Sequence, residues 1–381
     1  MKEIGISALE EGQRLDRLLM RALPGAQSSF LYRMLRKKNI TLNGRKAAGG
    51  EKLQAGDLIR LYFSEETLKK LEGRSGESAS FKAEEEALQK LYGRYPGIEL
   101  SIVYEDGNVL LIDKPAGMLS QKSKPGDISL NEYALGYLLR KGALSPGDLQ
   151  LFHPSVCNRL DRNTSGIVAV GKTAFGLREL SKMFRERTGE KDYLCLVKGR
   201  IYEEAHLRGR LIKEERSNTV SVISSPLSEG SGETEILTFV TPLVQSAGGL
   251  RDQKDDKDHP DHKNQKGQKD SKGREKLPPL TLISVRLITG KSHQIRAHLP
   301  SIGHPIAGDP KYGDPVLNEA LRRAYGLRRQ CLHAGMLSFP EETALPGLAG
   351  RCFLAPLPED FENVLKGLGM ERFTDPAHWR I

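Results

Sequence analysis

A single carboxylate between two arginines is the part of this sequence that most directly predicts chemistry. Residues 158–166 read Asn-Arg-Leu-Asp-Arg-Asn-Thr-Ser-Gly, so Arg159 and Arg162 closely flank Asp161. Nearby positive charge favours the ionised form of a carboxylate, and arginine binds phosphate through paired hydrogen bonds. The segment therefore predicts acid-type chemistry on a polyanion, with both arginines binding substrate. Taken alone, Asp161 would more commonly be a helix cap or a salt-bridge partner.

A second polar segment follows about 130 residues later. Residues 287–298 read Leu-Ile-Thr-Gly-Lys-Ser-His-Gln-Ile-Arg-Ala-His, and residues 303–313 read Gly-His-Pro-Ile-Ala-Gly-Asp-Pro-Lys-Tyr-Gly. Together with residues 158–166, these segments resemble the RluA-type family of RNA pseudouridine synthases. That family carries a His-Arg-Leu-Asp-x-x-Thr-Ser-Gly motif and a later Thr-Gly-Arg-x-His-Gln-Ile/Leu-Arg-x-His motif. The resemblance runs from about residue 101 to about residue 337, and motifs of this length and order are specific.

The resemblance implies an enzyme that breaks the N1–C1′ bond of uridine, turns the base and rejoins it through C5. It assigns Asp161 as the catalytic carboxylate and Arg296 as its partner, and we expect the two to form a bidentate pair. We also expect Ser292 to cap a helix in which His293 and Arg296 share one face. The reaction needs no cofactor, and no metal site is expected.

Three more residues are expected to contact the extruded nucleotide. Tyr193 lies in a Lys-x-Tyr segment whose tyrosine, in the family, stacks on the base and is implicated in removal of the C5 proton. Ile295 occupies the position of a family residue that contacts the base, although it could equally be ordinary core. Arg159 is long enough to fill the vacated base stack, since extrusion costs a few kcal/mol.

Two positions depart from the family pattern. Asn158 replaces the usual histidine, and Lys291 replaces a common arginine. Asparagine cannot shuttle protons near neutral pH, and lysine lacks the planar fork of arginine. We interpret Asn158 as a tolerated variant. It is also the one feature that supports an alternative, a catalytically inactive RNA-binding or ribosome-assembly protein on the same fold.

The first 63 residues predict a small basic unit of two helices and a hairpin. They contain 12 Lys and Arg against 6 Asp and Glu. Leu15, Leu18, Leu19 and Ala22 recur at helical spacing, Ser28 or Ser29 can cap a second helix, and Asn43-Gly44 is a hairpin turn signal. The layout resembles an S4 RNA-binding domain. Its expected RNA-binding residues are Arg33, Arg36, Lys37, Lys38 and Arg45.

The remaining sequence predicts a linker over residues 64–95 and a catalytic domain over residues 96–381. The fold class expected is α+β, a pseudouridine synthase fold with a mixed, largely antiparallel central sheet. A charged insertion interrupts it at 245–278. Residues 251–276 contain no apolar side chain, which predicts disorder. The strand-like runs on either side, 235–241 and 280–287, are expected to pair.

Bulk properties agree with an RNA partner. The 381 residues carry a net charge of +9, which suits a polyanion but says nothing of fold. The four cysteines form no C-x-x-C pair and no signal peptide is apparent, so we expect a cytoplasmic protein, and we expect it to be a monomer. The expected substrate is structured RNA, with large-subunit (23S) ribosomal RNA favoured by family analogy and tRNA as the alternative.

Overall fold

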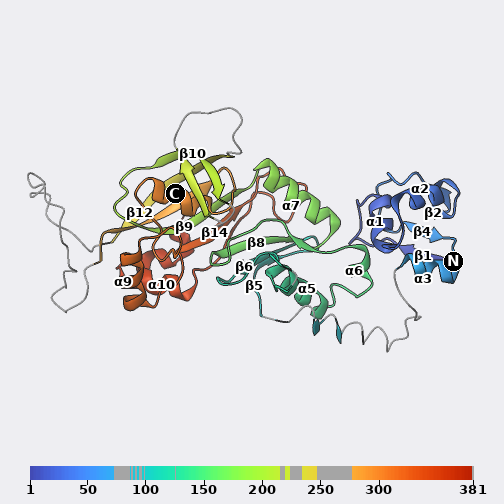
Figure 1. Cartoon of the computed structure of the whole chain (residues 1–381), viewed down its shortest axis with the longest axis horizontal. Coiled ribbons are helices and arrows are strands. Elements are labelled where there is room, and N and C mark those ends of the chain that lie inside the picture. Colours follow the sequence, from blue (N-terminus) through green and yellow to red (C-terminus); the bar gives the residue numbers. More distant parts are fainter. Residues whose placement is uncertain are drawn as a thin grey trace, which may run out of the picture.

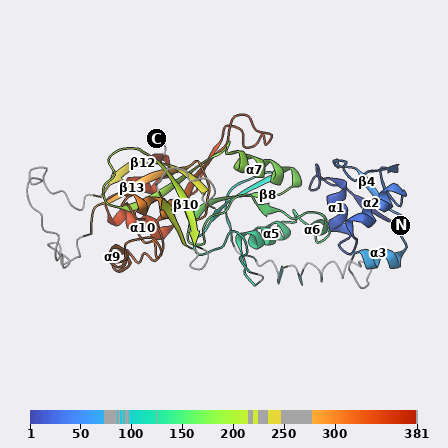
Figure 2. The ribbon, with the colours of Figure 1, turned by 45° about the horizontal axis from the view of Figure 1, so that its top comes forward.

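A computed structural model of the chain describes residues 1–72, 86, 89–90, 92–93, 97, 99–124, 126–214, 219–223, 234–246 and 277–379. They form a small N-terminal unit and a larger body built on one long sheet (Figure 1). Both views place the N-terminal unit at one end of the molecule, with α9 (Pro315–Tyr325) and α10 (Glu359–Gly367) toward the other (Figures 1 and 2). Most of the expected linker and the whole 251–276 insertion lie outside the described residues.

The N-terminal unit has the two helices and the hairpin that the sequence predicts. Its sheet order is β1-β4-β2-β3, and Asn43 and Gly44 both have positive φ values, 52° and 73°, as a tight hairpin turn requires. The expected serine cap is wrong, because Gln27 is the N-cap of the second helix and makes no side-chain cap. The elements are β1 (Lys2–Gly5), α1 (Leu15–Ala22), α2 (Ser28–Arg36), β2 (Ile40–Leu42), β3 (Arg45–Lys46), β4 (Leu58–Leu61) and α3 (Glu65–Leu71).

Helix α3 extends this unit into the range where the sequence predicts a linker. Leu68 is buried in the core of the unit, and the backbone N–H of Gly25 donates to the carbonyl of Leu71 at 2.7 Å. The unit also contacts the body directly. The backbone N–H of Ala174 donates to the carbonyl of Leu9 at 2.9 Å, and Arg21 donates to the carbonyl of Leu151 at 3.3 Å.

The body confirms the expected fold class. Its sheet has 11 strands, in the order β11-β10-β12-β13-β9-β14-β8-β6-β5 with β15 on β14 and β7 on β8. The β14–β8 pair is parallel, and the other described pairs are antiparallel. The strands are β5 (Ser101–Glu105), β6 (Val109–Lys114), β7 (Ser155–Val156), β8 (Ser165–Gly171), β9 (Glu190–Lys198), β10 (Ala205–Glu214), β11 (Thr219–Ile223), β12 (Thr234–Gln245), β13 (Leu280–Leu287), β14 (Leu332–Ser338) and β15 (Cys352–Leu354).

Helices cover both faces of the sheet, as the buried side chains require. Alternate residues of a strand point to opposite faces, so in β8 Val168 and Val170 join one core while Ile167 and Ala169 join another. The first core includes α5 and α8, and the second includes α7. A third core lies under α9 and α10. The remaining helices are α5 (Leu130–Arg140), α6 (Asp148–Leu151), α7 (Ala174–Glu186), α8 (Gln294–Ser301), η1 (Glu371–Thr374) and η2 (Pro376–His378).

The expected pairing of the two runs around the insertion is confirmed. Strands β12 and β13 are antiparallel neighbours, with Thr238 opposite Leu287 and Gln245 opposite Thr281. The insertion therefore joins the two strands at the end where Gln245 and Leu280 lie. No helix within the described ranges is long and apolar enough to cross a membrane.

Candidate active site

A cavity of about 760 Å³ opens where the loop before β8, the first residues of β9, the end of β13 and the start of α8 meet. Segments more than 100 residues apart in the sequence form its wall. The cavity brings together every catalytic and substrate-binding residue of the body that the sequence predicts. These are Arg159, Asp161, Arg162, Tyr193, His293, Ile295 and Arg296.

The loop that carries Asp161 is held in place by buried polar contacts. The backbone N–H of Thr164 donates to the carbonyl of Asp161 at 3.0 Å, which closes a turn. One residue earlier, the hydroxyl of Ser120 accepts from the N–H of Leu160 and donates to its carbonyl, both at 3.0 Å. Ser120 is itself buried. The backbone on either side of the carboxylate is therefore fixed before any substrate binds.

A buried lysine supports the same loop from behind. The Lys114 ammonium is fully buried and donates to the carbonyls of Pro115 at 2.9 Å, Met118 at 2.9 Å and Arg162 at 3.2 Å. Burial, and then the charge of Arg329, lowers the pKa of Lys114 to about 7. Three carbonyl dipoles replace the lost hydration of this ammonium. Its contact with Arg162 fixes the residue directly after Asp161.

Asn158 plays a structural part at the position where the family often has histidine. Its Nδ2 donates to the carbonyl of Ile167 at 3.2 Å, and its Oδ1 accepts from the N–H of Ala169 at 2.8 Å. Both ends of the amide therefore bind the backbone of β8. An amide matches one donor and one acceptor without any change of protonation.

Arg296 connects Asp161 to a second carboxylate, which corrects the expected pairing. Its fork is bidentate to Asp309, with Nε to Oδ2 at 2.7 Å and Nη2 to Oδ1 at 3.0 Å. Asp161 receives a single hydrogen bond, from Nη1 to Oδ2 at 2.9 Å. Burial disfavours the guanidinium charge, but the hydrogen bonds to Asp309 and then Asp161 outweigh it and raise the pKa of Arg296.

His293 lies on the other side of the carboxylate. Its Nε2 is 3.9 Å from Oδ2 of Asp161, and its Nδ1 is 2.9 Å from the hydroxyl of Tyr312. Burial lowers the pKa of His293 despite the nearby carboxylate. The expected Ser292 cap is wrong, because α8 begins at Gln294 and His293 is the N-cap in a left-handed conformation with φ 57°. This turn directs His293 and Arg296 toward the same carboxylate.

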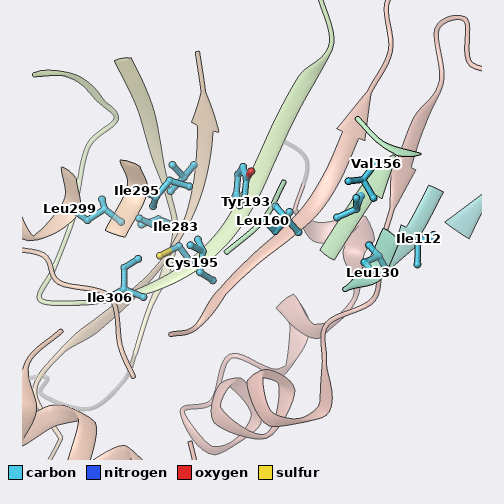
Figure 3. Close-up of a cluster of buried hydrophobic side chains, with 14 of the residues drawn as sticks. Ile112, Leu130, Val156, Leu160, Tyr193, Cys195, Ile283, Ile295, Leu299 and Ile306 are labelled. Atoms are coloured by element: carbon cyan, nitrogen blue, oxygen red, sulfur yellow. The ribbon is translucent and has the colours of Figure 1, made fainter. Parts of the chain in front are cut away.

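Tyr193 and Ile295 form an apolar wall. Both belong to the central buried cluster (Figure 3). Both also line the cavity. Tyr193 is 7% exposed and Ile295 is 4% exposed, so each presents only an edge to the cavity. Burial, and then the charge of Asp161, raises the pKa of the Tyr193 phenol. The phenol is therefore protonated at neutral pH. Ile295 belongs to the hydrophobic core and also forms part of the cavity wall.

The predicted cations fall into two groups. Arg159 and Arg162 are exposed at the mouth of the cavity, where they can reach a bound polyanion. The five cations of the N-terminal unit are exposed and lie outside the cavity wall, on α2, the turn after it and β3. They are Arg33, Arg36, Lys37, Lys38 and Arg45.

The arrangement suits charge stabilisation more than metal chemistry. The Asp161 side chain is 26% exposed, so Arg296 orients it from one side while the cavity remains open on the other. A fixed carboxylate can stabilise positive charge on a sugar, attack C1′ or accept a proton. Among the residues that the structure describes, no group of three or more His, Cys, Asp or Glu could hold a metal ion.

Sequence reasoning missed the functional weight of Asp309 and Ser120, whereas it expected the Asp-Lys-Pro-x-Gly segment that contains Lys114 to support the site from beneath. Asp309 is fully buried and also accepts from the backbone N–H of Lys311 at 2.8 Å and of Tyr312 at 3.2 Å. Residues 308–313 follow the Gly-Asp-x-x-Tyr-Gly pattern of the family, which predicted a loop near the site but not the bond from Arg296 to Asp309. Ser120 carried no sequence signal, because its role depends on a contact 40 residues away.

Comparison with known proteins identifies the family of this chain. Residues 108–301 match the family model described as RNA pseudouridylate synthase. The chain is 31% identical to ribosomal large subunit pseudouridine synthase C of Haemophilus ducreyi, over 96% of this chain and 95% of that protein. It is 30% identical to the protein of that name from Escherichia coli, over 89% of this chain and 88% of that protein.

A solved structure, human RNA pseudouridylate synthase domain containing 4, aligns over 76% of this chain and 97% of its own, with 19% sequence identity and a TM-score of 0.49. The family match spans Asp161, Tyr193 and Arg296, and the curated relatives cover nearly the whole sequence. The chain belongs to the RNA pseudouridylate synthase family.

Proposed function

We propose that this protein isomerises specific uridines of large-subunit ribosomal RNA to pseudouridine, with Asp161 as the catalytic carboxylate. The observation that carries the proposal is the Arg296–Asp161 hydrogen bond of 2.9 Å inside a cavity of about 760 Å³. The names of the curated relatives support the choice of RNA. A tRNA substrate is the alternative from family analogy.

The chemistry fits one carboxylate. Cleavage of the N1–C1′ bond develops positive charge on the ribose, which a fixed negative charge stabilises. Glycoside hydrolases use two carboxyl groups because a leaving group departs and water enters. Here the freed base stays in the cavity and returns through C5, so water has no part in the reaction. The Tyr193–Ile295 wall gives the uracil ring an apolar surface and limits water.

Arg159 and Arg162 bind the RNA backbone at the mouth, and Arg159 also fills the gap left by the extruded base. The exposed cations of the N-terminal unit bind a more distant part of the RNA. We further propose that the protein acts as a monomer in the cytoplasm. The reaction requires no cofactor.

The alternative of an inactive RNA-binding protein loses its sequence support. It rested on Asn158 in place of histidine, and both ends of that amide bind the backbone of β8. A residue used in this way does not need to transfer protons.

Tritium release tests the proposal. Ribosomal large-subunit RNA transcribed with uridine tritiated at C5 is incubated with wild type and with Asp161→Asn, and tRNA labelled in the same way is run in parallel. Wild type releases tritium from the ribosomal RNA, and Asp161→Asn does not, although filter binding shows that it still binds. Equal release by both proteins excludes Asp161 from the mechanism. Release from tRNA alone would support the alternative substrate.

A further inference from the structure

Lys191 lies in the cavity wall but has no part in the chemistry described above. It is the second residue of β9, two positions before Tyr193, and both side chains line the cavity. Asp192 lies between them and points to the opposite face, where it pairs with Arg286 at 2.7 Å. Two steps along a strand span roughly 7 Å. The Lys191 side chain therefore starts about 7 Å from the proposed base-stacking residue, on the same face.

The Lys191 ammonium lies against an aromatic ring, with Nζ 5.3 Å from the centroid of Phe184. Among the described residues, no carboxylate lies within salt-bridge distance of it. The neighbouring Glu190 pairs instead with Arg286, at 3.0 Å. Burial, and then the charge of Arg187, lowers the pKa of Lys191. Lys191 is thus a partly buried cation beside another cation.

The Lys191 side chain is in the wall of the cavity of about 760 Å³. Gly290 lies in the cavity wall, and a Cβ placed there would be 3.6 Å from Nζ of Lys191. Arg187, in the turn after α7, and Lys291, in the loop after β13 and next to Gly290, are both exposed and line the same cavity. Three cations from three segments thus line one cavity, and Glu190, the acid next to Lys191, is already paired with Arg286. An anion bound there would offset both the burial of Lys191 and the repulsion from Arg187.

We propose that Lys191, with Arg187 and Lys291, forms a subsite for a backbone phosphate of the RNA next to the uridine that enters the cavity. The inference rests on the proposed function. The subsite fixes the nucleotide by its phosphate while Tyr193 contacts its base, so the ribose between them is placed against Asp161. Lys191 is therefore a positioning residue for the substrate.

A salt series tests the subsite. Initial rates of tritium release from ribosomal RNA are measured for wild type, Lys191→Met, Lys191→Arg and the control Lys182→Met. Lys182 is an exposed lysine of α7 that lies outside the cavity wall. Loss of one phosphate contact in Lys191→Met raises KM and reduces the slope of log KM against log salt by about one. Lys191→Arg restores the slope, and Lys182→Met matches wild type.

A merely structural role for Lys191 would alter rates without changing that slope, so an unchanged slope in Lys191→Met overturns the proposal. If wild type releases no tritium at all, the proposed function fails instead. The subsite is then tested through the salt dependence of RNA binding, which needs no turnover.

A second experiment identifies the phosphate. RNAs with a single methylphosphonate at each linkage around the target uridine are bound to Asp161→Asn, with and without Lys191→Met. We expect the methylphosphonate at one linkage to weaken binding by the same factor as Lys191→Met. Combining that methylphosphonate with Lys191→Met should weaken binding no further than either change alone. Inhibition by inorganic phosphate with no effect at any linkage would mean that the cluster binds an adventitious ion only, and would overturn the proposal.

Discussion

Arg296 binds Asp309 through two nitrogens, at 2.7 and 3.0 Å, and reaches Asp161 with its third, at 2.9 Å. The two carboxylates differ in their surroundings, because Asp309 is fully buried while the Asp161 side chain is 26% exposed. The planar guanidinium has little freedom to rotate once Asp309 accepts hydrogen bonds from two of its nitrogens. Asp309 therefore sets the direction from which Asp161 is bound, without itself facing the cavity.

Replacing Asp309 by asparagine should impair catalysis more than binding. The amide would keep the volume of the side chain but lose the charge and one acceptor, so the guanidinium would shift, and small misplacements of reacting groups cost on the order of 10²-fold in rate. We expect kcat for tritium release to fall by about that factor in Asp309→Asn while RNA affinity is kept.

The matched control for that change is Asp314→Asn, because Asp314 caps α9 and pairs with Lys198 outside the cavity wall. This control should lower stability but leave kcat unchanged in the folded fraction. Equal kcat values for the two variants would contradict the positioning role of Asp309.

Asn158→Ala should destabilise the protein without changing the pH profile of the reaction. The substitution leaves the N–H of Ala169 and the carbonyl of Ile167 without their partner. Unsatisfied buried polar groups cost about 1–3 kcal/mol, so the free energy of unfolding in urea should fall by that amount. The pH dependence of kcat/KM, measured on the folded protein, should keep its shape. A lost limb in that profile would instead assign Asn158 a direct part in catalysis.

Acid should weaken the fold through His333. This residue is fully buried between Ser165, at 2.9 Å, and the carbonyl of Ala355, at 3.1 Å. Burial lowers its pKa from 6.5 to about 4. Between about pH 6.5 and 4 the unfolded chain therefore binds a proton at His333 that the folded protein does not. The contribution of neutral His333 to the free energy of unfolding is fully present above about pH 6.5 and is lost as the pH falls toward 4.

A shift of this size corresponds to about 3 kcal/mol. Urea unfolding at pH 7, 5.5 and 4.5 measures it. His333→Gln should flatten the dependence by about one proton, whereas the exposed His206→Gln should not. An unchanged slope in His333→Gln would show that another group, such as the buried His298, causes the acid sensitivity.

The N-terminal cations should contribute binding but not chemistry. We expect Arg36→Gln combined with Lys37→Gln to raise KM for ribosomal RNA and to reduce its salt slope by about two, one for each lost phosphate contact. The value of kcat should not change, because neither residue lines the cavity. Arg322→Gln with Arg323→Gln on α9 removes the same charge elsewhere and should have no effect. Equal effects of the two pairs would point to net charge alone.

The sequence predicted the parts of this protein that depend on local pattern. The helices at Leu15–Ala22 and Ser28–Arg36 follow apolar spacing, and the β12–β13 pair follows two strand-like runs. The meeting of Asp161 with Arg296 came from the family resemblance, since 135 positions separate them and no local rule brings them together.

The rest depended on tertiary contacts that sequence patterns do not encode. Asp309 takes the fork of Arg296 because both are buried side by side, and the pattern indicated only one of the two carboxylate partners of that arginine. The short α3 was missed because seven residues hold too few apolar positions to show a period. The left-handed conformation of His293 replaced the expected serine cap for a similar reason, since non-glycine residues adopt it only where surrounding contacts require it.

The β12–β13 hairpin keeps the insertion point between its two strands far from the cavity. Leu287 lines the cavity at one end of β13, and Leu280 lies at the other, where the chain leads into residues 247–276. Seven steps along the strand put roughly 23 Å between them. Fluorophores, affinity tags or extra domains inserted between Gln245 and Leu280 would leave catalysis unchanged. This position is therefore suited to labels for following the enzyme on its RNA.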